Sequence, residues 1–122
     1  MTRILVVDDE PEMVEIITMM LENEGYEIEK AYNGHECLNK LEKGKFDLVL
    51  LDIRMPKMDG WETLRKMKEK KIVDGTKVII LTVEKGPGVE IFGLQNFVKD
   101  YLTKPFDRET LVESITGVLE DK

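Results

Sequence analysis

Polar residues follow four short apolar runs of this 122-residue chain. Asp8 and Asp9 follow the first run, Asp52 follows the next, and Thr82 and Lys104 follow two more. If the runs are parallel strands of one open sheet, their carboxyl ends meet at one edge, which is where α/β proteins bind ligands. The sequence therefore predicts a crevice that contains three carboxylates, a hydroxyl and an ammonium group.

The three carboxylates favour a divalent cation. Packed together, they repel one another and raise each other's pKa, and a hard cation relieves that repulsion. An all-oxygen cluster with room for water suits Mg²⁺, or alternatively Mn²⁺. Lys104 adds a positive charge on a flexible side chain. With metal bound, such a site is nearly neutral and suits a dianionic phosphoryl group, whose transfer needs mainly positioning and charge neutralisation.

Asp52 is the candidate nucleophile, because an ionised aspartate is competent to form an aspartyl phosphate. A glycine-rich phosphate loop after the first run is not an alternative here. Asp8, Asp9 and Glu10 stand in its place and would repel a phosphate unless a metal intervened.

The apolar runs predict strands that are buried on both faces, as in a parallel sheet, at residues 3–7, 47–51, 77–81 and 98–102. Residues 26–31 alternate polar and apolar side chains, which favours an edge strand. Helical spacing predicts five helices: from Pro11 to a stop at Gly25, before a stop at Gly44, over about 60–70, over about 87–96, and after an N-cap at Asp107. Glycines and a proline disfavour a stiff helix at 87–96.

Strands that alternate with helices predict a doubly wound α/β fold, flavodoxin-like (βα)5. Right-handed crossovers place helices on both faces of the sheet. With the second strand at an edge, the five-stranded parallel sheet has the order 2-1-3-4-5, and its switch point lies between strands one and three. The length fits one domain, so we expect residues 1–122 to form a single domain.

Three stretches resemble the receiver domain of two-component response regulators, in the single-domain form of chemotaxis regulators: Ile4–Glu10, Leu51–Gly60 and Asp100–Phe106. The resemblance covers nearly the whole chain. It implies a receiver domain that accepts a phosphoryl group on Asp52 from the phosphohistidine of a sensor histidine kinase or a phosphotransfer protein. The reaction would depend on Mg²⁺. The chain would catalyse its own phosphorylation and slow dephosphorylation rather than turn over a substrate.

The resemblance also implies a metal site. Asp9, Asp52 and the backbone carbonyl of Arg54 would hold Mg²⁺ directly, and Asp8 would act mainly through bound water. Thr82 would contact the phosphoryl oxygens together with Lys104.

The same resemblance assigns Lys104 to the phosphoryl group and implies a cis Lys104–Pro105 peptide. Tyr101 would be the switch aromatic, which turns inward when Thr82 moves toward the phosphate. The output would be a changed surface formed by the helix at 87–96, the fifth strand and the last helix, recognised by an unknown downstream protein target.

The sequence departs from the receiver pattern near the site. Val83 stands where a small residue is usual, so we expect it to narrow access to the phosphoryl group. Phe97 and Val98 replace the usual Gly-Ala pair before the fifth strand. Arg54 and Glu84 should flank the site and pair, which would shield an acyl phosphate from water and predicts slow autodephosphorylation.

The same residues also allow other interpretations. Asp8 or Asp9 could cap the helix that starts at Pro11, Thr82 could cap a helix, and Tyr101 could be a fixed surface aromatic. An aspartyl phosphatase of the haloacid dehalogenase type would need Asp-x-Asp after the first strand and a cap domain. A phosphorylation-independent protein-interaction module on the same fold is the alternative function. Loss of acceptor or metal residues would favour it, and none is lost.

The charge of the chain excludes several partner classes. There are 18 Lys and Arg residues against 25 Asp and Glu residues, a formal charge of −7. This balance argues against direct binding of nucleic acid or of an anionic membrane surface. No apolar run is long enough to cross a membrane, and the single Cys37 fits a reducing compartment, so we expect a cytoplasmic protein. No DNA-binding segment follows the last predicted helix, so we expect no transcriptional output within this chain.

Overall fold

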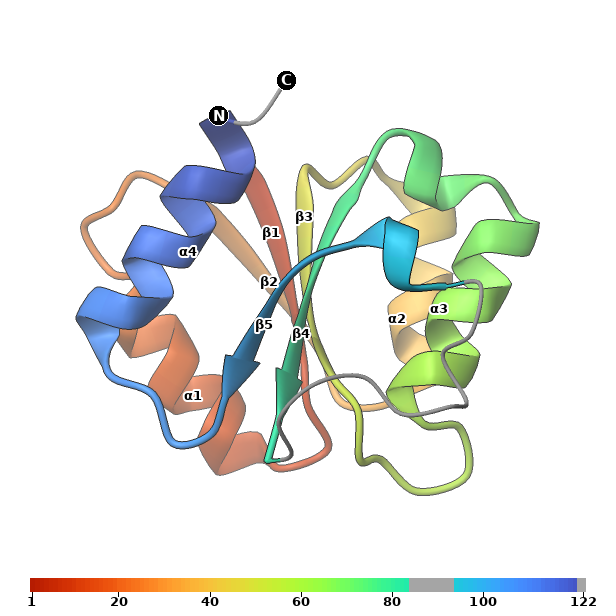
Figure 1. Cartoon of the computed structure of the whole chain (residues 1–122), viewed down its shortest axis with the longest axis horizontal. Coiled ribbons are helices and arrows are strands. Elements are labelled where there is room, and N and C mark those ends of the chain that lie inside the picture. The colour runs from red at the N-terminus through yellow and green to blue at the C-terminus, as the bar shows by residue number, and fades with distance from the viewer. Residues whose placement is uncertain (84–93, 121–122) are drawn as a thin grey trace.

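The fold is a five-stranded parallel sheet between two layers of helices (Figure 1). The computed structural model describes residues 1–83 and 94–120. The strands are β1 (Arg3–Val7), β2 (Glu27–Ala31), β3 (Leu48–Asp52), β4 (Lys77–Thr82) and β5 (Val98–Thr103). They pair in the order β2-β1-β3-β4-β5 with every neighbour parallel, which confirms the predicted sheet and its order.

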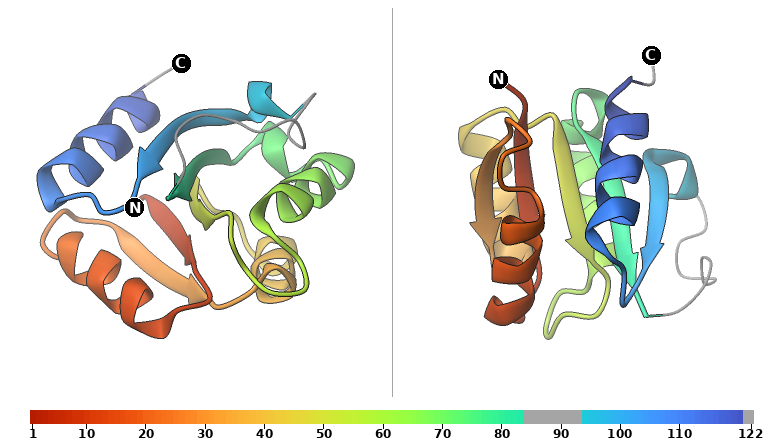
Figure 2. Two further views of the ribbon diagram at one scale, coloured as in Figure 1. Left: turned by 60° about the horizontal axis from the view of Figure 1, so that its bottom comes forward. Right: turned by 90° about the vertical axis from the view of Figure 1, so that its left-hand side faces the viewer.

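Helices cover both faces of the sheet, as the doubly wound fold requires (Figure 2). They are α1 (Pro11–Met20), α2 (Gly34–Lys43), α3 (Gly60–Glu69) and α4 (Arg108–Glu120), with short 3-10 turns η1 (Ile72–Asp74) and η3 (Gln95–Phe97). The views place α1 and α4 on one face and α2 and α3 on the other. Each face has its own buried core.

Local capping explains where three of these helices begin. The side chains of Asn33, Asp59 and Asp107 each accept a hydrogen bond of 2.8 Å from a backbone N–H three residues later. Such caps satisfy amides that the first helical turn leaves unpaired. The N-cap predicted at Asp107 is therefore confirmed. Asp59 starts α3 only a few residues after the carboxyl end of β3.

Two predicted helices differ from the structure. Helix α1 ends at Met20 rather than close to Gly25. Asn23 has a φ of 70° and Gly25 a φ of 85°, and this left-handed backbone cannot continue a right-handed helix. The helix predicted at 87–96 lies mostly outside the described residues. Its described end is not α-helical, because η3 occupies Gln95–Phe97.

Gly60 allows α3 to approach the carboxyl end of β3 more closely than any other residue type would. A Cβ atom at this position would lie 2.4 Å from the backbone oxygen of Asp52 and 2.8 Å from the Cα of Ile53. The contact atoms belong to the backbone, so no side-chain rotation relieves the clash. We expect Gly60→Ala to lower the free energy of unfolding by about 1–3 kcal/mol, the usual range for overpacking, in urea denaturation.

Gly117 provides the matched control. It is exposed on α4, and an added Cβ would meet no atom within 4 Å. Gly117→Ala should therefore stabilise the protein by about 0.5–1 kcal/mol, because glycine disfavours helix interiors. If the two variants shift the urea midpoint in the same direction, the steric argument for Gly60 is wrong.

Candidate functional site

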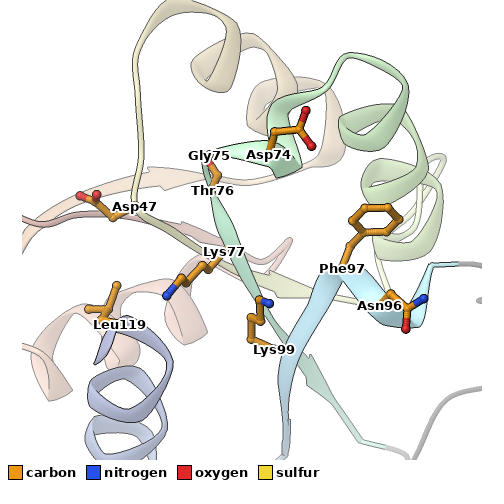
Figure 3. Close-up of a pocket in the computed structure, with 9 residues that line it drawn as sticks. All are labelled: Asp47, Asp74, Gly75, Thr76, Lys77, Asn96, Phe97, Lys99 and Leu119. Carbon is orange, nitrogen blue, oxygen red and sulfur yellow. The ribbon is translucent and has the colours of Figure 1, made fainter. Parts of the chain in front are cut away.

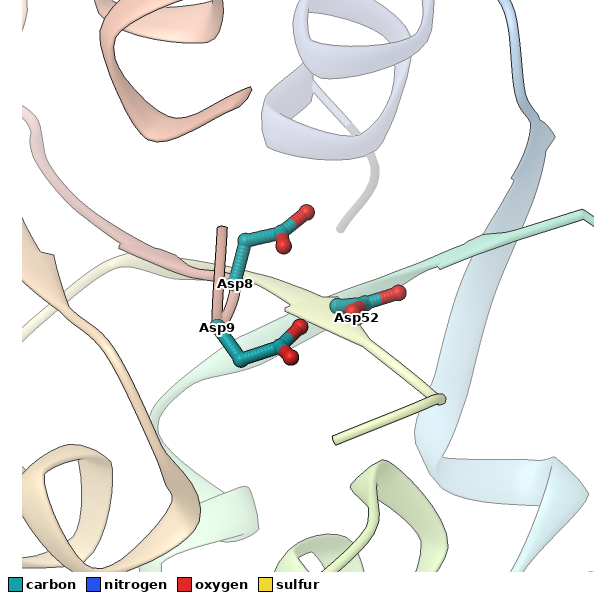
Figure 4. Close-up of side chains that lie close together, drawn as sticks. All are labelled: Asp8, Asp9 and Asp52. Atoms are coloured by element: carbon teal, nitrogen blue, oxygen red, sulfur yellow. The ribbon is translucent and has the colours of Figure 1, made fainter. Parts of the chain in front are cut away.

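Three carboxylates meet at the carboxyl edge of the sheet (Figure 4). Asp8 and Asp9 follow β1, and Asp52 is the last residue of β3. One oxygen atom from each lies within 4.8 Å of the others. The parallel pairing of β1 with β3, in which Val7 is opposite Leu51, brings these residues together across the predicted switch point.

The three side chains differ in exposure. Asp8 is fully buried, Asp52 is 5% exposed and Asp9 is half-buried. Asp8 also accepts a hydrogen bond of 3.0 Å from the backbone N–H of Glu10 through its Oδ1 atom. This bond holds the loop before α1, but Asp8 does not cap the helix, because the N-cap residue is Glu10 and, among the described residues, no side chain accepts a hydrogen bond from the first turn. The other oxygen of Asp8 accepts from Lys104.

Lys104 neutralises part of the cluster. Its Nζ atom donates to Asp8 Oδ2 at 2.8 Å and to Asp52 Oδ1 at 3.2 Å, and its side chain is 12% exposed. The backbone N–H of Lys104 donates to Thr82 O at 2.7 Å, and the Lys104–Pro105 peptide is cis, as expected. Burial alone would lower the pKa of Lys104, but the hydrogen bond to Asp8 and the charge of Asp52 raise it overall.

The surroundings of Asp52 change the pKa of its carboxyl group. Burial raises its pKa to about 6, with repulsion from Asp8 acting in the same direction and attraction by Lys104 opposing it. Burial removes a carboxylate from water and a neighbouring carboxylate repels it, so both effects disfavour its ionised form. A cation bound beside Asp52 would therefore attract its carboxylate and reduce the repulsion between Asp52 and Asp8.

The cluster fits a magnesium ion. Mg²⁺ takes oxygen ligands at about 2.1 Å in an octahedron, which separates ligand oxygens by about 3–4 Å. The three carboxylate oxygens already lie within 4.8 Å of one another. Mg²⁺ also keeps several water ligands, and the half-exposed Asp9 leaves one side of the cluster open to them.

The raised pKa of Asp52 predicts an unusual pH dependence of stability in metal-free protein. The native carboxyl has a pKa of about 6 against a reference value of 3.8, so the native state binds more protons than the unfolded state between these values. Stability is then gained as pH falls through the native pKa, and it is lost as pH rises from about 4 to 6. We expect Asp52 to account for up to about 3 kcal/mol of this loss, measured by urea denaturation at pH 4 and pH 7.

The Asp52→Asn variant isolates this effect from all other titrations. It should be more stable than wild type at pH 7 by about 1–3 kcal/mol, and equally stable near pH 4. A difference that is the same at both pH values would contradict the electrostatic account. Saturating Mg²⁺ should stabilise wild type at pH 7 and thereby reduce the difference.

The other predicted site residues lie around this cluster. Thr82 ends β4 and is buried, one residue beyond Leu81, the partner of Asp52 in the sheet. Val83 follows with 55% of its surface exposed. Arg54 is exposed in the loop between β3 and α3. Glu84 lies outside the described residues, so the expected Arg54–Glu84 pair stays a prediction, as does the effect of Val83 on access.

Tyr101 lies on β5 opposite Ile80, with its ring packed toward the core under α3. Its hydroxyl oxygen is buried, and none of the residues in 1–83 and 94–120 gives it a hydrogen bond. Burial raises the pKa of this phenol. A surface aromatic would keep its hydroxyl in water, so the simple surface interpretation does not describe this side chain.

Trp61 is the residue near the site to which sequence reasoning gave no role. It is 3% exposed on α3, and its ring lies 6.4 Å from that of Tyr101 between centroids. The signal in the sequence that could have pointed to Trp61 is its position directly after the stretch Leu51–Gly60, which resembles a receiver motif. The contact itself joins residues 40 positions apart, which no local pattern predicts.

A hollow at the opposite edge of the sheet contains none of the predicted site residues (Figure 3). It has a volume of about 420 Å³ and lies at the amino ends of the strands, between Asp47, Lys77 and Phe97. Its lining contains side chains of both charges and an aromatic ring.

Among the helices of the described part of the chain, none has the length and apolar character needed to span a membrane.

Comparisons with known proteins agree with this geometry. The family model of the response regulator receiver domain matches residues 4–116. Protein PilH of Pseudomonas aeruginosa is 38% identical over 119 residues, 98% of each chain. The transcriptional regulatory protein TrcR of Mycobacterium tuberculosis is 38% identical over 117 residues, 96% of this chain. This chain spans 45% of TrcR and about half of several other regulators that it matches.

Solved structures share the fold over almost the full chain. A CheY-like receiver domain protein from Methanospirillum hungatei has a TM-score of 0.89 and 35% identity, with 99% of this chain and 98% of that one covered. The response regulator TrrA from Thermotoga maritima, solved in complex with Mg²⁺ and BeF, has a TM-score of 0.84 and 38% identity. The alignment covers 97% of this chain and 99% of TrrA.

Proposed function

Because this chain belongs to the response regulator receiver domain family of two-component systems, we propose that it accepts a phosphoryl group on Asp52 in a Mg²⁺-dependent reaction. The donor is the phosphohistidine of a sensor histidine kinase or a phosphotransfer protein. The observation that supports this most directly is the meeting of Asp52 with Asp8, Asp9 and Lys104 at the carboxyl edge of the sheet. Residues 1–122 constitute the receiver unit of the proposal.

In this proposal Asp52 is the nucleophile. One of its carboxylate oxygens forms a bond to phosphorus while the bond from phosphorus to the donor nitrogen breaks, and the electron pair leaves with the imidazole. Asp9, Asp52 and the backbone carbonyl of Arg54 would hold Mg²⁺, and Asp8 would act through bound water. When bound, the metal neutralises negative charge on the phosphoryl group. The TrrA complex with Mg²⁺ and BeF supports this choice of metal by analogy.

Lys104 and Thr82 bind the phosphoryl oxygens in the proposal. Lys104 is already within hydrogen-bond distance of Asp52, so its Nζ atom has only to exchange a carboxylate oxygen for a phosphoryl oxygen. Thr82 then moves toward the phosphate and Tyr101 responds, which changes the surface that an unknown downstream protein recognises. Of that surface, β5 and α4 are described, whereas the segment at 84–93 lies outside the described residues.

The proposed setting is the cytoplasm, which fits the single, buried cysteine. A net charge of −7 gives no reason to expect direct contact with nucleic acid or a membrane surface. The phosphorylation-independent interaction module is not favoured, since the acceptor, the acidic residues and the lysine are all present and lie together.

Intact mass after incubation with acetyl phosphate or phosphoramidate tests the proposal. We expect a single phosphoryl adduct in the presence of Mg²⁺ and none in the presence of a chelator. If neither small donors nor a histidine kinase label the protein, the proposal is wrong, and the interaction module becomes the better account.

Arg54→Ala tests the predicted control of phosphoryl lifetime. If Arg54 screens the acyl phosphate through an exposed ion pair, its removal should speed hydrolysis by up to about fivefold, the equivalent of the roughly 1 kcal/mol that such pairs contribute. The decay of the adduct is followed by intact mass after removal of the donor. Arg65→Ala, at an exposed position of α3, is the control. Equal decay rates in wild type and Arg54→Ala would refute the screening role.

A further inference from the structure

Trp61 and Tyr101 lie against each other between α3 and the edge strand β5. Their ring centroids are 6.4 Å apart with an angle of 50° between the ring planes. This distance and tilt fall within the range of favourable aromatic pairs. Trp61 is almost completely buried, whereas Tyr101 is half-buried, so the indole is the fixed member of the pair and the phenol is the one with room to move.

Trp61 is also tied to the acceptor through its neighbour. Gly60 donates its backbone N–H to Ile53 O at 2.8 Å, and its Cα hydrogens face the backbone oxygen of Asp52 so closely that a Cβ there would lie 2.4 Å from that oxygen. The first turn of α3 thus rests directly on the backbone of Asp52. A shift of that backbone displaces Gly60 and, with it, the adjacent indole.

Two opposing contributions determine the position of the Tyr101 ring. Contact with Trp61 favours the inward position. The buried hydroxyl, which has no hydrogen-bond partner among the described residues, disfavours it. Because the two contributions oppose each other, a change in either one shifts the ring between its inward and outward positions, which is how a ligand acts on such an equilibrium.

We propose that Trp61 is a positioning residue that holds Tyr101 inward and couples it to the backbone of Asp52. This connection through α3 acts beside the one through Thr82 on β4. The proposal rests on the proposed function for the role of Asp52 and Tyr101, and it adds a second contact by which the acceptor influences the switch aromatic.

Removal of the aromatic pair should shift the ratio of inward to outward Tyr101 by roughly 2- to 10-fold toward the outward position. Trp61→Leu removes the ring and keeps an apolar side chain. Trp61→Phe keeps an aromatic partner and should stay close to wild type. Trp61→Met, with its adaptable side chain, replaces Trp61→Leu if the leucine variant does not fold.

Fluorine NMR of protein labelled with 3-fluorotyrosine provides the measurement. The chain has three tyrosines, and the Tyr101 resonance is identified by its loss in Tyr101→Phe. The change of its chemical shift between H₂O and D₂O reports how much water reaches the ring. We expect this solvent isotope shift to rise in Trp61→Leu relative to wild type and Trp61→Phe, in metal-free, unphosphorylated protein.

Addition of Mg²⁺ and fluoroberyllate, a phosphoryl mimic, tests the coupling. With the mimic bound, the ratio of outward to inward Tyr101 should remain at least about twofold higher in Trp61→Leu than in wild type. If Trp61→Leu only lowers the urea midpoint while both Tyr101 readouts match wild type, Trp61 is a packing residue and the proposal is wrong. Failure of the proposed function is a separate result. In that case wild type would show no phosphoryl adduct, whereas the Tyr101 resonance of unphosphorylated protein could still respond to Trp61→Leu.

Discussion

The Asp52→Asn variant is expected to acquire no phosphoryl adduct under conditions that label the wild-type chain fully. An amide cannot act as the nucleophile, and it removes one of the three carboxylates that approach within 4.8 Å of one another. Its shape and its hydrogen bond to Lys104 are retained, so the fold should be intact. Intact mass with acetyl phosphate and Mg²⁺ gives the result, which we expect to be complete loss of labelling.

Asp74→Asn is the matched control for this substitution. Asp74 is the last residue of η1, is exposed at the opposite end of the sheet, and makes no contact with the acidic cluster. Its amide variant should be labelled as wild type is. An adduct of wild-type yield on Asp52→Asn would mean that another residue accepts the phosphoryl group.

Replacement of Lys104 by Met should have the largest effect on stability. Lys104 is the cation that pairs with both Asp8 and Asp52, and it is 12% exposed. Removal of one partner from a largely buried ion pair leaves the other charge uncompensated. We expect the free energy of unfolding of metal-free protein at pH 7 to fall by about 2–4 kcal/mol. The pKa of Asp52 should rise further, because the attraction that opposes its increase is lost.

Mg²⁺ should restore much of this loss, because the metal replaces the missing positive charge. Urea denaturation of Lys104→Met with and without Mg²⁺ measures the restoration. Lys99→Met, at an exposed position of β5, the strand that precedes Lys104, is the control and should change stability by less than about 0.5 kcal/mol. Equal effects of the two lysine variants would show that Lys104 does not compensate the buried carboxylates.

Much of the fold could be predicted from short apolar runs and from the polar turn residues that separate them. The fully buried run at residues 48–51 is central strand β3, and the alternating run at 26–31 is edge strand β2. Once the strands are parallel, the residues that follow them must share one edge, so the meeting of Asp8 with Asp52 needed no further information.

Features that depend on exact register could not be predicted. A bulge in β5 sets Val78 opposite Val98 but Ile79 opposite Asp100. In a regular strand, Val98 and Tyr101 would face opposite sides of the sheet. The bulge reverses the alternation between them, so both pack toward the core under α3. The position of Tyr101 beside Trp61 follows from that one inserted residue.

The end of α1 was missed for a local reason. Gly25 is a sound stop signal, but Asn23 adopts left-handed backbone first and the helix ends at Met20. Asparagine tolerates this conformation better than most residues, yet a single asparagine in a polar stretch is weak evidence before the structure is known.

Identification of the phosphorylated residue tests the central claim most directly. Sodium borohydride reduces an acyl phosphate to an alcohol, which converts phosphorylated aspartate into homoserine and leaves free carboxylates unchanged. After treatment with acetyl phosphate, reduction and peptide mass mapping, we predict homoserine at position 52, in the presence of Mg²⁺ and not with a chelator. Homoserine at position 8 or 9, or none in protein that carries the adduct, would contradict the assignment of Asp52 as the acceptor.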